Sequence, residues 1–372
     1  RGSTDLMTQI LAVRSAFPAR RYRQEELTRA VADRAGLNGT RRALLERLHR
    51  NSGVDTRHTA LPLEEYRNLD GVGAATDRYL DEAAALGERA LRAALDAAGV
   101  GSGDLDLLIV TSVTGVAVPS LDARLIPRLG LRPDIKRLPV FGLGCVAGAA
   151  ALSRLHDYLL GWPGHTAALL AVELCSLTWP GNLTTADMVA TGLFGDGAAA
   201  LVAEGDELAS QRARRRACPR VISTRSEVYP DSADTLGWRL GRDGFGIVLT
   251  ADLSEVVERR LGEAATSFLA ERGLTTDDIT TWICHPGGPK VLDAVRKSLK
   301  LPDEALAASW KSLAEVGNLS SVSVLHILEQ TMTEPGFPGQ GRAAGQAENN
   351  GAFGLMIGLG PGVSAELVLL QW

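Results

Sequence analysis

Val140-Phe-Gly-Leu-Gly-Cys-Val-Ala-Gly-Ala-Ala-Ala151 joins an apolar segment to a run of small residues through two glycines. The pattern predicts a strand that ends near residue 143 and a helix over 146–160. Apolar runs flank it on both sides, LDLLIVT at 105–111 and TAALLAVE at 166–173, and each has the length of a buried strand. Strands that alternate with helices in this way predict a layered α/β fold with mostly parallel central sheets.

The rest of the chain continues the alternation. The first half adds a predicted strand at 10–13 and helices at 25–35 and 81–98, the latter stopped by Gly99. The second half repeats the order of elements without sequence identity to the first. Its predicted helices are 254–273, 288–299 and 320–332, and its predicted strands are 281–284 and a pair within 354–370.

These patterns divide the chain into two halves. We interpret residues 1–9 as a leftover tag and disordered start, 10–215 as the half with the candidate nucleophile Cys145, and 216–372 as the second half. Two stretches are predicted to be surface connections, RARRR at 212–216 and the Gly-, Pro- and Asn-rich 334–351. For the basic run, a solvated loop is favoured over contact with an anionic ligand.

Composition excludes several classes of function. The 372 residues are 45% apolar and 22% charged, with a net charge of -5, so no electrostatic case exists for binding a nucleic acid. The longest apolar runs fall short of the ~20 residues that a membrane span needs. The four cysteines are scattered without a CxxC pair, which indicates neither a zinc site nor a disulfide framework and favours a reducing cytoplasm.

Cys145 is the first candidate for chemistry. It follows Gly142 and Gly144 and precedes the predicted helix 146–160. A thiol at a helix N-terminus meets the positive end of the helix dipole, which favours the thiolate. The glycines let a substrate and an oxyanion approach the backbone closely. Local context alone leaves a catalytic nucleophile and a buried structural cysteine equally open.

His285 and Asn318 are the next candidates. His285 follows the predicted strand 281–284 within the turn sequence HPGGP, whereas the other five histidines are interpreted as surface or packing residues. Asn318, in VGNLSS, is first of all an N-cap signature for the following helix. Its amide could also donate a hydrogen bond to a carbonyl oxygen.

Five segments occur in a telling order: Gly-Cys145 before the small-residue helix, FGDGA from Phe194, HPGGP from His285, GNLSS around Asn318, and GLGPG at 358–362. Together they resemble the signature segments of type III polyketide synthases, the chalcone synthase family, from residue 10 to 372. Each motif alone is weak, but the ordered set is specific. The sequence GLGC-VAGAAA resembles the bacterial members of this family more than the plant members.

The resemblance implies an α/β, thiolase-like duplicated layered fold (αβαβα) with mixed central sheets, and a homodimer. It also implies that Cys145 takes the starter acyl group from CoA as a thioester, with His285 holding the thiolate as an ion pair. His285 and Asn318 would then donate hydrogen bonds to the enolate that forms when malonyl-CoA loses carbon dioxide. Repeated condensation and cyclisation would give a pyrone or resorcinol-type product.

The resemblance further implies which molecules meet the protein. CoA thioesters are the expected small-molecule substrates, with no metal or redox cofactor and no nucleic acid or membrane partner. Arg47 and Arg50 fall where the family places basic residues for CoA phosphates, although Asn51 replaces a usual lysine. Val118 matches the segment that reaches into the partner subunit's cavity.

Other positions match substrate-binding residues of the family. Phe194 matches the gatekeeping aromatic beside the nucleophile, Ile247 falls near a second aromatic gate of the plant enzymes, and Trp238 lies near a small cavity residue of those enzymes. Ile247 and its aliphatic neighbours predict an aliphatic starter over an aromatic one. The remaining matches are Cys175, Thr178, Val113, Ser320, Gly360 and Pro361, for all of which ordinary packing is the alternative.

Two other functions remain open at this point. One is a ketoacyl synthase III-like condensing enzyme that uses an extender bound to a carrier protein. The other is a non-catalytic relative that acts as a binding or scaffolding partner. The sequence alone sets neither the starter, the number of extensions nor the ring closure, because these depend on the volume of the cavity.

Overall fold

The structure is a computed structural model that describes residues 7–69, 71–211, 218–230, 232–241, 244–250, 252–334 and 351–372. The predicted surface connection at 212–216, nearly all of that at 334–351, and residues 1–6 lie outside these ranges. Strand β1 begins at Thr8, so the prediction that residues 8 and 9 belong to a disordered start is wrong. Thr8 is fully buried and pairs with Val221 in the second half.

Strands from both halves join in one nine-stranded sheet, in the order β11-β12-β13-β8-β1-β7-β6-β4-β5. The halves meet where β1 pairs with β8. Only β4–β5, β4–β6 and β11–β12 are parallel, so the sheet is mixed, as the fold class predicts, and not mostly parallel as the alternation alone suggested. The bounds are β1 Thr8–Ala16, β4 Leu107–Thr111, β5 Lys136–Val140, β6 Thr166–Leu174, β7 Asp196–Glu204, β8 Arg220–Val228, β11 Ile279–Cys284, β12 Phe353–Gly360 and β13 Ser364–Gln371.

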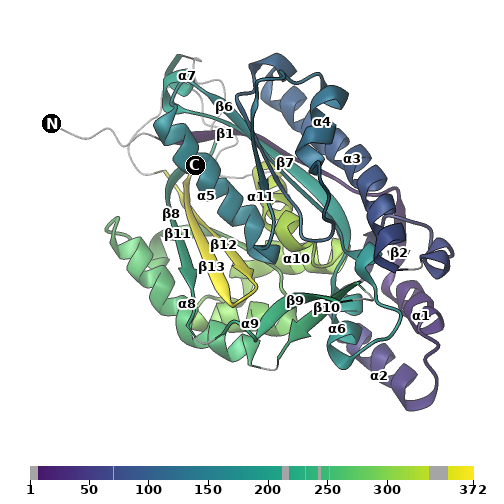
Figure 1. The fold of residues 1–372 in the computed structure, drawn as a ribbon. Helices are drawn as coiled ribbons and strands as arrows, with labels where there is room; N and C mark the ends of the chain where they lie inside the picture. Colours follow the sequence, from purple (N-terminus) through teal and green to yellow (C-terminus); the bar gives the residue numbers. More distant parts are fainter. Residues whose placement is uncertain are drawn as a thin grey trace.

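Three layers of helices cover the two halves of this sheet, one on each outer side and one between the halves (Figure 1). Helix α3 (Gly71–Ala98) packs on β1, β6 and β7, with α4 (Leu121–Leu129) beside it. Helices α8 (Leu253–Ala270) and α9 (Pro289–Ser298) pack together against the second half. Between the halves lie α5 (Ala147–Gly161) and α11 (Ser323–Thr333), and α5 contacts strands of both. The predicted αβαβα layering is therefore confirmed.

Local sequence explains the main elements. All nine residues of β6 are buried because helices cover both of its faces, which accounts for its continuous apolar run. Helix α3 ends at Gly99, which adopts a left-handed φ of 67° as a helix-terminating glycine should. The helix begins at Gly71, about ten residues before the predicted start at 81. The prediction missed its first turns because they lack a strong apolar face.

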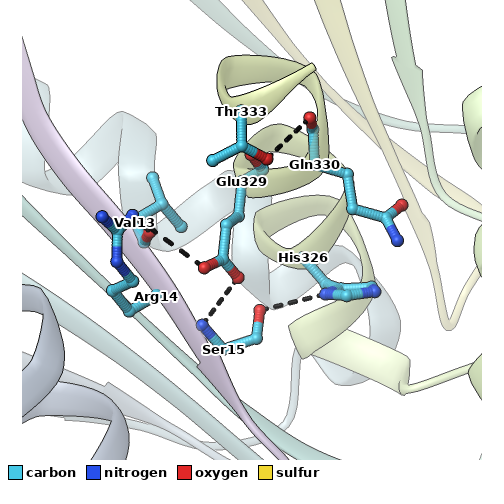
Figure 2. A network of polar contacts seen from close by, with 7 residues as sticks. All are labelled: Val13, Arg14, Ser15, His326, Glu329, Gln330 and Thr333. Atoms are coloured by element: carbon cyan, nitrogen blue, oxygen red, sulfur yellow. Dashed lines mark hydrogen bonds and ion pairs between the residues drawn. The ribbon is translucent and has the colours of Figure 1, made fainter. Parts of the chain in front are cut away.

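The two central helices approach each other closely through small residues. A Cβ atom on Gly148 of α5 would lie 2.1 Å from the Ser321 carbonyl oxygen, so no larger residue fits there. Helix α11 is also tied to β1 by polar contacts (Figure 2). The Ser15 hydroxyl lies 3.0 Å from His326 Nδ1, and the Ser15 N–H donates to Glu329 at 2.8 Å. These contacts hold the second half's central helix against the first half's sheet.

Smaller elements complete the fold around one end of the sheet. Two ribbons stand apart from the large sheet, β2–β3 and β9–β10. No helix in the described part of the chain has the length and apolar character to cross a membrane. The bounds are α1 Gln24–Arg34, α2 Gly39–Arg50, α6 Thr185–Leu193, α7 Asp206–Gln211, α10 Ala307–Val316, β2 Arg20–Arg23, β3 Thr56–Thr59, β9 Leu236–Gly241 and β10 Gly244–Leu249.

Candidate active site

One cavity brings the three predicted catalytic residues together. Cys145, His285 and Asn318 all line it, and its volume is about 50 Å³. Phe194, Ile247 and Gly360 line it too, as the resemblance implied. Most of the remaining wall is aliphatic and was not singled out from the sequence: Val189, Ala190, Leu193, Leu236, Leu249, Leu253, Val257, Gly287, Val291, Leu359 and Val363.

Cys145 lies in the short 3₁₀ turn Gly144–Val146 that leads into α5. Gly144 has a φ of 56°, and a Cβ atom there would lie 2.6 Å from Pro361. A Cβ atom on Gly360 would likewise lie 2.7 Å from Val146. The GLGPG segment thus packs directly on the nucleophile turn, and glycine is required on both sides of that contact. Pro361 serves this packing and does not line the cavity.

Burial determines the resting charge of the Cys145 thiol. The residue is 6% exposed, and burial raises the pKa of the thiol to about 12. The Ser320 hydroxyl lowers this pKa in part, and the nearby Glu173 raises it further. Burial therefore opposes the thiolate that the helix-dipole argument favoured.

His285 follows β11 and is held by its backbone. Its N–H donates to the Ile357 carbonyl at 2.9 Å, which continues the pairing of β11 with β12. Burial lowers the pKa of the imidazole to about 4, and Nδ1 has no hydrogen-bond partner among the described residues. The imidazole is therefore neutral near pH 7, and the ion pair with Cys145 stays a prediction.

Asn318 is not the N-cap that its sequence signature predicted, because Leu319 precedes the short turn Ser320–Val322. Its Oδ1 instead accepts the Ser320 N–H at 2.8 Å, a local side-chain to backbone bond two residues along the chain. This bond identifies the oxygen of the amide, so the Nδ2 group is the one that can donate into the cavity. The backbone is fixed as well, because the Asn318 N–H donates to Leu193 and its carbonyl accepts from Gly195.

Thiol alkylation should report the resting state of this pair. With a Cys145 pKa near 12, the thiolate fraction grows with pH across the neutral range. The rate of iodoacetamide labelling at Cys145 is therefore expected to rise about tenfold per pH unit between roughly pH 7 and 9. A rate already constant from about pH 6 upward would instead indicate a stable thiolate–imidazolium pair.

A smaller pocket lies behind Phe194. Cys175, Thr178 and Trp238 line it, and Phe194 and Ala190 border both this pocket and the main cavity. The Phe194 and Trp238 rings lie 5.9 Å apart between centroids. The structure therefore places these three predicted cavity residues in a second compartment, which shares Phe194 and Ala190 with the main cavity.

The remaining predicted residues do not line the cavity around Cys145, although the Ser320 hydroxyl is close enough to the thiol to lower its pKa. Val113 and Ser320 are buried but line neither pocket; the Val113 N–H donates to Glu173, a fully buried carboxylate. Val118 is 96% exposed and does not line the cavity of its own chain. Arg47 and Arg50 are both exposed on α2. No cluster of three or more potential metal-ligating side chains occurs in the ranges that the structure covers.

Comparison with known proteins matches nearly the whole chain to one family. The models for the N-terminal and C-terminal domains of chalcone and stilbene synthases match residues 3–207 and 220–372. A 1,3,6,8-tetrahydroxynaphthalene synthase from Streptomyces peucetius subsp. caesius is 52% identical over 99% of this chain and 94% of its own. A putative chalcone synthase from Bacillus subtilis is 31% identical over 87% of each chain.

Solved structures show the same fold. The crystal structure of PKS-I from the brown alga Ectocarpus siliculosus superposes with a TM-score of 0.91 at 25% identity, covering all of both chains. The tetrahydroxynaphthalene synthase of Streptomyces coelicolor A3(2), a bacterial type III polyketide synthase, gives a TM-score of 0.86 at 30% identity over 98% of this chain and 99% of its own. The ketoacyl synthase alternative receives no support from these matches. This chain belongs to the chalcone and stilbene synthase family of type III polyketide synthases.

Proposed function

We propose that the protein is a 1,3,6,8-tetrahydroxynaphthalene synthase that condenses malonyl-CoA on Cys145. The observation that carries this proposal is the shared cavity of Cys145, His285 and Asn318 in a chain that is 52% identical, over 99% of its length, to a synthase of that name.

Each extension balances with CoA thioesters alone. The Cys145 sulfur attacks the thioester carbonyl of the first substrate, and the CoA thiol leaves with the proton. A second malonyl-CoA loses carbon dioxide, and the electron pair of the broken bond becomes an enolate that accepts hydrogen bonds from His285 and Asn318. The enolate carbon attacks the acyl group on Cys145, a carbon–carbon bond forms, and the Cys145 thiolate is released. The extended chain is now a CoA thioester, and Cys145 takes it back with release of the CoA thiol before the next extension. No metal or redox cofactor enters this sequence.

The proposed product follows from the same chemistry. A naphthalene with hydroxyls at alternate positions is the product expected from a poly-β-ketone built of five two-carbon units. One ring closes by aldol addition with loss of water, and the other by attack on the thioester with release of the thiol. Each ring carries the resorcinol pattern of hydroxyls. A pyrone from an aliphatic starter is the second candidate, favoured by the aliphatic wall that includes Ile247, Leu249 and Val189.

Malonyl-CoA supplied alone is expected to give tetrahydroxynaphthalene as the main product, identified by mass spectrometry against an authentic standard. Hexanoyl-, decanoyl- and coumaroyl-CoA, each added with malonyl-CoA, should not raise the turnover. A strict requirement for one of these starters would refute the naphthalene assignment while leaving a type III synthase. If no CoA substrate gave any product, and product formed only with an extender bound to a carrier protein, the broader function would be refuted.

We also propose that the protein acts as a homodimer. Strand β5 lies at the edge of the sheet, and Val116, Val118, Leu138 and Phe141 near it are exposed apolar side chains. An unpaired edge beside apolar residues is a surface that a second copy can cover. Light scattering should give the mass of two chains, and Val118→Asp should shift the mass toward one; a monomeric unmodified protein would contradict this.

We propose that Arg47 and Arg50 bind the CoA phosphates. Both side chains are exposed on α2, which packs against α6, the helix that ends at Phe194 beside the cavity. Arginine suits this task because its guanidinium matches the geometry of phosphate oxygens.

A further inference from the structure

Arg57 is a buried cation without a carboxylate partner in the described chain. It lies on β3, 1% exposed, and its Nε and Nη2 donate to Gln24 Oε1 at 3.2 and 2.9 Å. Its Nη1 donates to the Phe194 carbonyl at 2.6 Å. The buried acid Asp196 interacts with it only at longer range and instead accepts from Ala60 and Ser176.

Charge makes this arrangement costly. Burial lowers the pKa of the guanidinium to about 10, so it remains charged at neutral pH. A buried charge is tolerated when it is hydrogen-bonded, and here each of the three guanidinium nitrogens donates one hydrogen bond. Gln24 completes the network by donating to the Gly192 carbonyl at 2.7 Å, in the helix that ends at Phe194.

The acceptor at Phe194 lies in the segment that fixes Asn318. Phe194 and Asn318 form a parallel bridge, in which the Asn318 N–H donates to Leu193 at 2.8 Å and the Gly195 N–H donates to Asn318 at 2.9 Å. Arg57 touches the other side of this bridge as well. A Cβ atom on Gly317 would lie 2.9 Å from Arg57 Cδ, so the stem of the arginine packs against the residue before Asn318.

A single side chain therefore contacts both segments of the bridge that carries the Phe194 ring and the Asn318 amide. Those two groups form one wall of the Cys145 cavity. Stabilisation of an enolate depends steeply on the distance and angle of its donors, so a small shift of the bridge would weaken it. Cys145 itself lies on a different support, the turn before α5 against Pro361.

We propose that Arg57 is a positioning residue for decarboxylation, which sets the place of the Asn318 amide through its bond to Phe194 and its contact with Gly317. The inference rests on the proposed decarboxylation of malonyl-CoA at this site. It separates the two halves of the reaction: loading of Cys145 does not need Arg57, whereas formation of the enolate does.

The test compares Arg57→Met and Arg57→Lys with Arg21→Met, on the neighbouring strand of the same ribbon. Arg21 is exposed and donates only to Thr56, so its variant is the matched control. Release of carbon dioxide from malonyl-CoA and iodoacetamide labelling of Cys145 are both measured, and the first is divided by the number of reactive Cys145 thiols. This division removes any loss that comes only from misfolded protein.

Arg57→Met is expected to lower decarboxylation per reactive thiol about a hundredfold with an unchanged labelling rate, and Arg57→Lys about tenfold, because a lysine keeps the charge but not the fork of donors. If Arg57→Met does not fold, Arg57→Lys decides the matter. Decarboxylation within about threefold of the unmodified protein in Arg57→Lys, or equal losses of labelling and decarboxylation, would overturn the inference alone. An unmodified protein that does not decarboxylate malonyl-CoA would overturn the proposed function, and this inference with it.

Discussion

Cys145→Ala is expected to abolish product formation, with turnover reduced roughly ten-thousandfold or more, because no other group in the cavity can hold the growing chain as a thioester. The fold should persist, since an alanine removes one sulfur atom at the edge of a turn that glycine contacts already define. Intact-protein mass spectrometry after incubation with malonyl-CoA should show no acyl adduct, and the thermal midpoint should change little.

Cys175 and Cys284 provide the controls. Both are buried, but Cys175 lies in the second compartment and Cys284 ends β11 with its carbonyl bound by Ser309. Cys284→Ala should still form the acyl adduct and make product. An adduct that survived in Cys145→Ala and mapped to Cys175 would show that the nucleophile had been assigned to the wrong cysteine.

Asn318→Ala is expected to lower malonyl-CoA decarboxylation by about a hundred- to a thousandfold, the effect typical of losing one oxyanion donor. The labelling rate of Cys145 should stay near that of the unmodified protein, because Asn318 touches the cavity through its amide and not the thiol turn. The measurements are release of carbon dioxide and iodoacetamide labelling on the same preparation.

His285→Ala is the companion variant, expected to slow both decarboxylation and acyl loading. His285 follows β11 and Asn318 precedes the turn before α11, so the two changes should not share a structural cause. The division of roles would be refuted if both variants lost thiol reactivity equally.

The sequence singled out the three candidate catalytic residues because they lie in short, ordered motifs with distinctive turn chemistry. Cys145, His285 and Asn318 do line one cavity, as the resemblance implied. What the motifs could not supply is the electrostatic balance at the thiol. The sequence indicated the start of a helix at Cys145 but not the burial of its side chain. That burial raises the pKa of the thiol.

The aliphatic wall and the Arg57 network were missed for a related reason. The wall draws one to three residues each from α6, α8, β9 and β10, and ordinary core positions give the same signal as cavity positions. From its sequence context, a short polar strand, Arg57 would be interpreted as a surface cation. Only the tertiary structure shows that its side chain is buried and donates to the Phe194 carbonyl. The mixed sheet was predicted by resemblance, whereas the alternation alone gave the wrong strand directions.

The β9–β10 ribbon has a consequence for how such an enzyme can evolve. It stands outside the nine-stranded sheet, yet it supplies Ile247 and Leu249 to the cavity and Trp238 to the second compartment. Substitutions there can change the room available to a growing chain while leaving the pairing of the large sheet intact. Product size and folding are thereby encoded in separable parts of the polypeptide, which lets a lineage explore new products without first losing its scaffold.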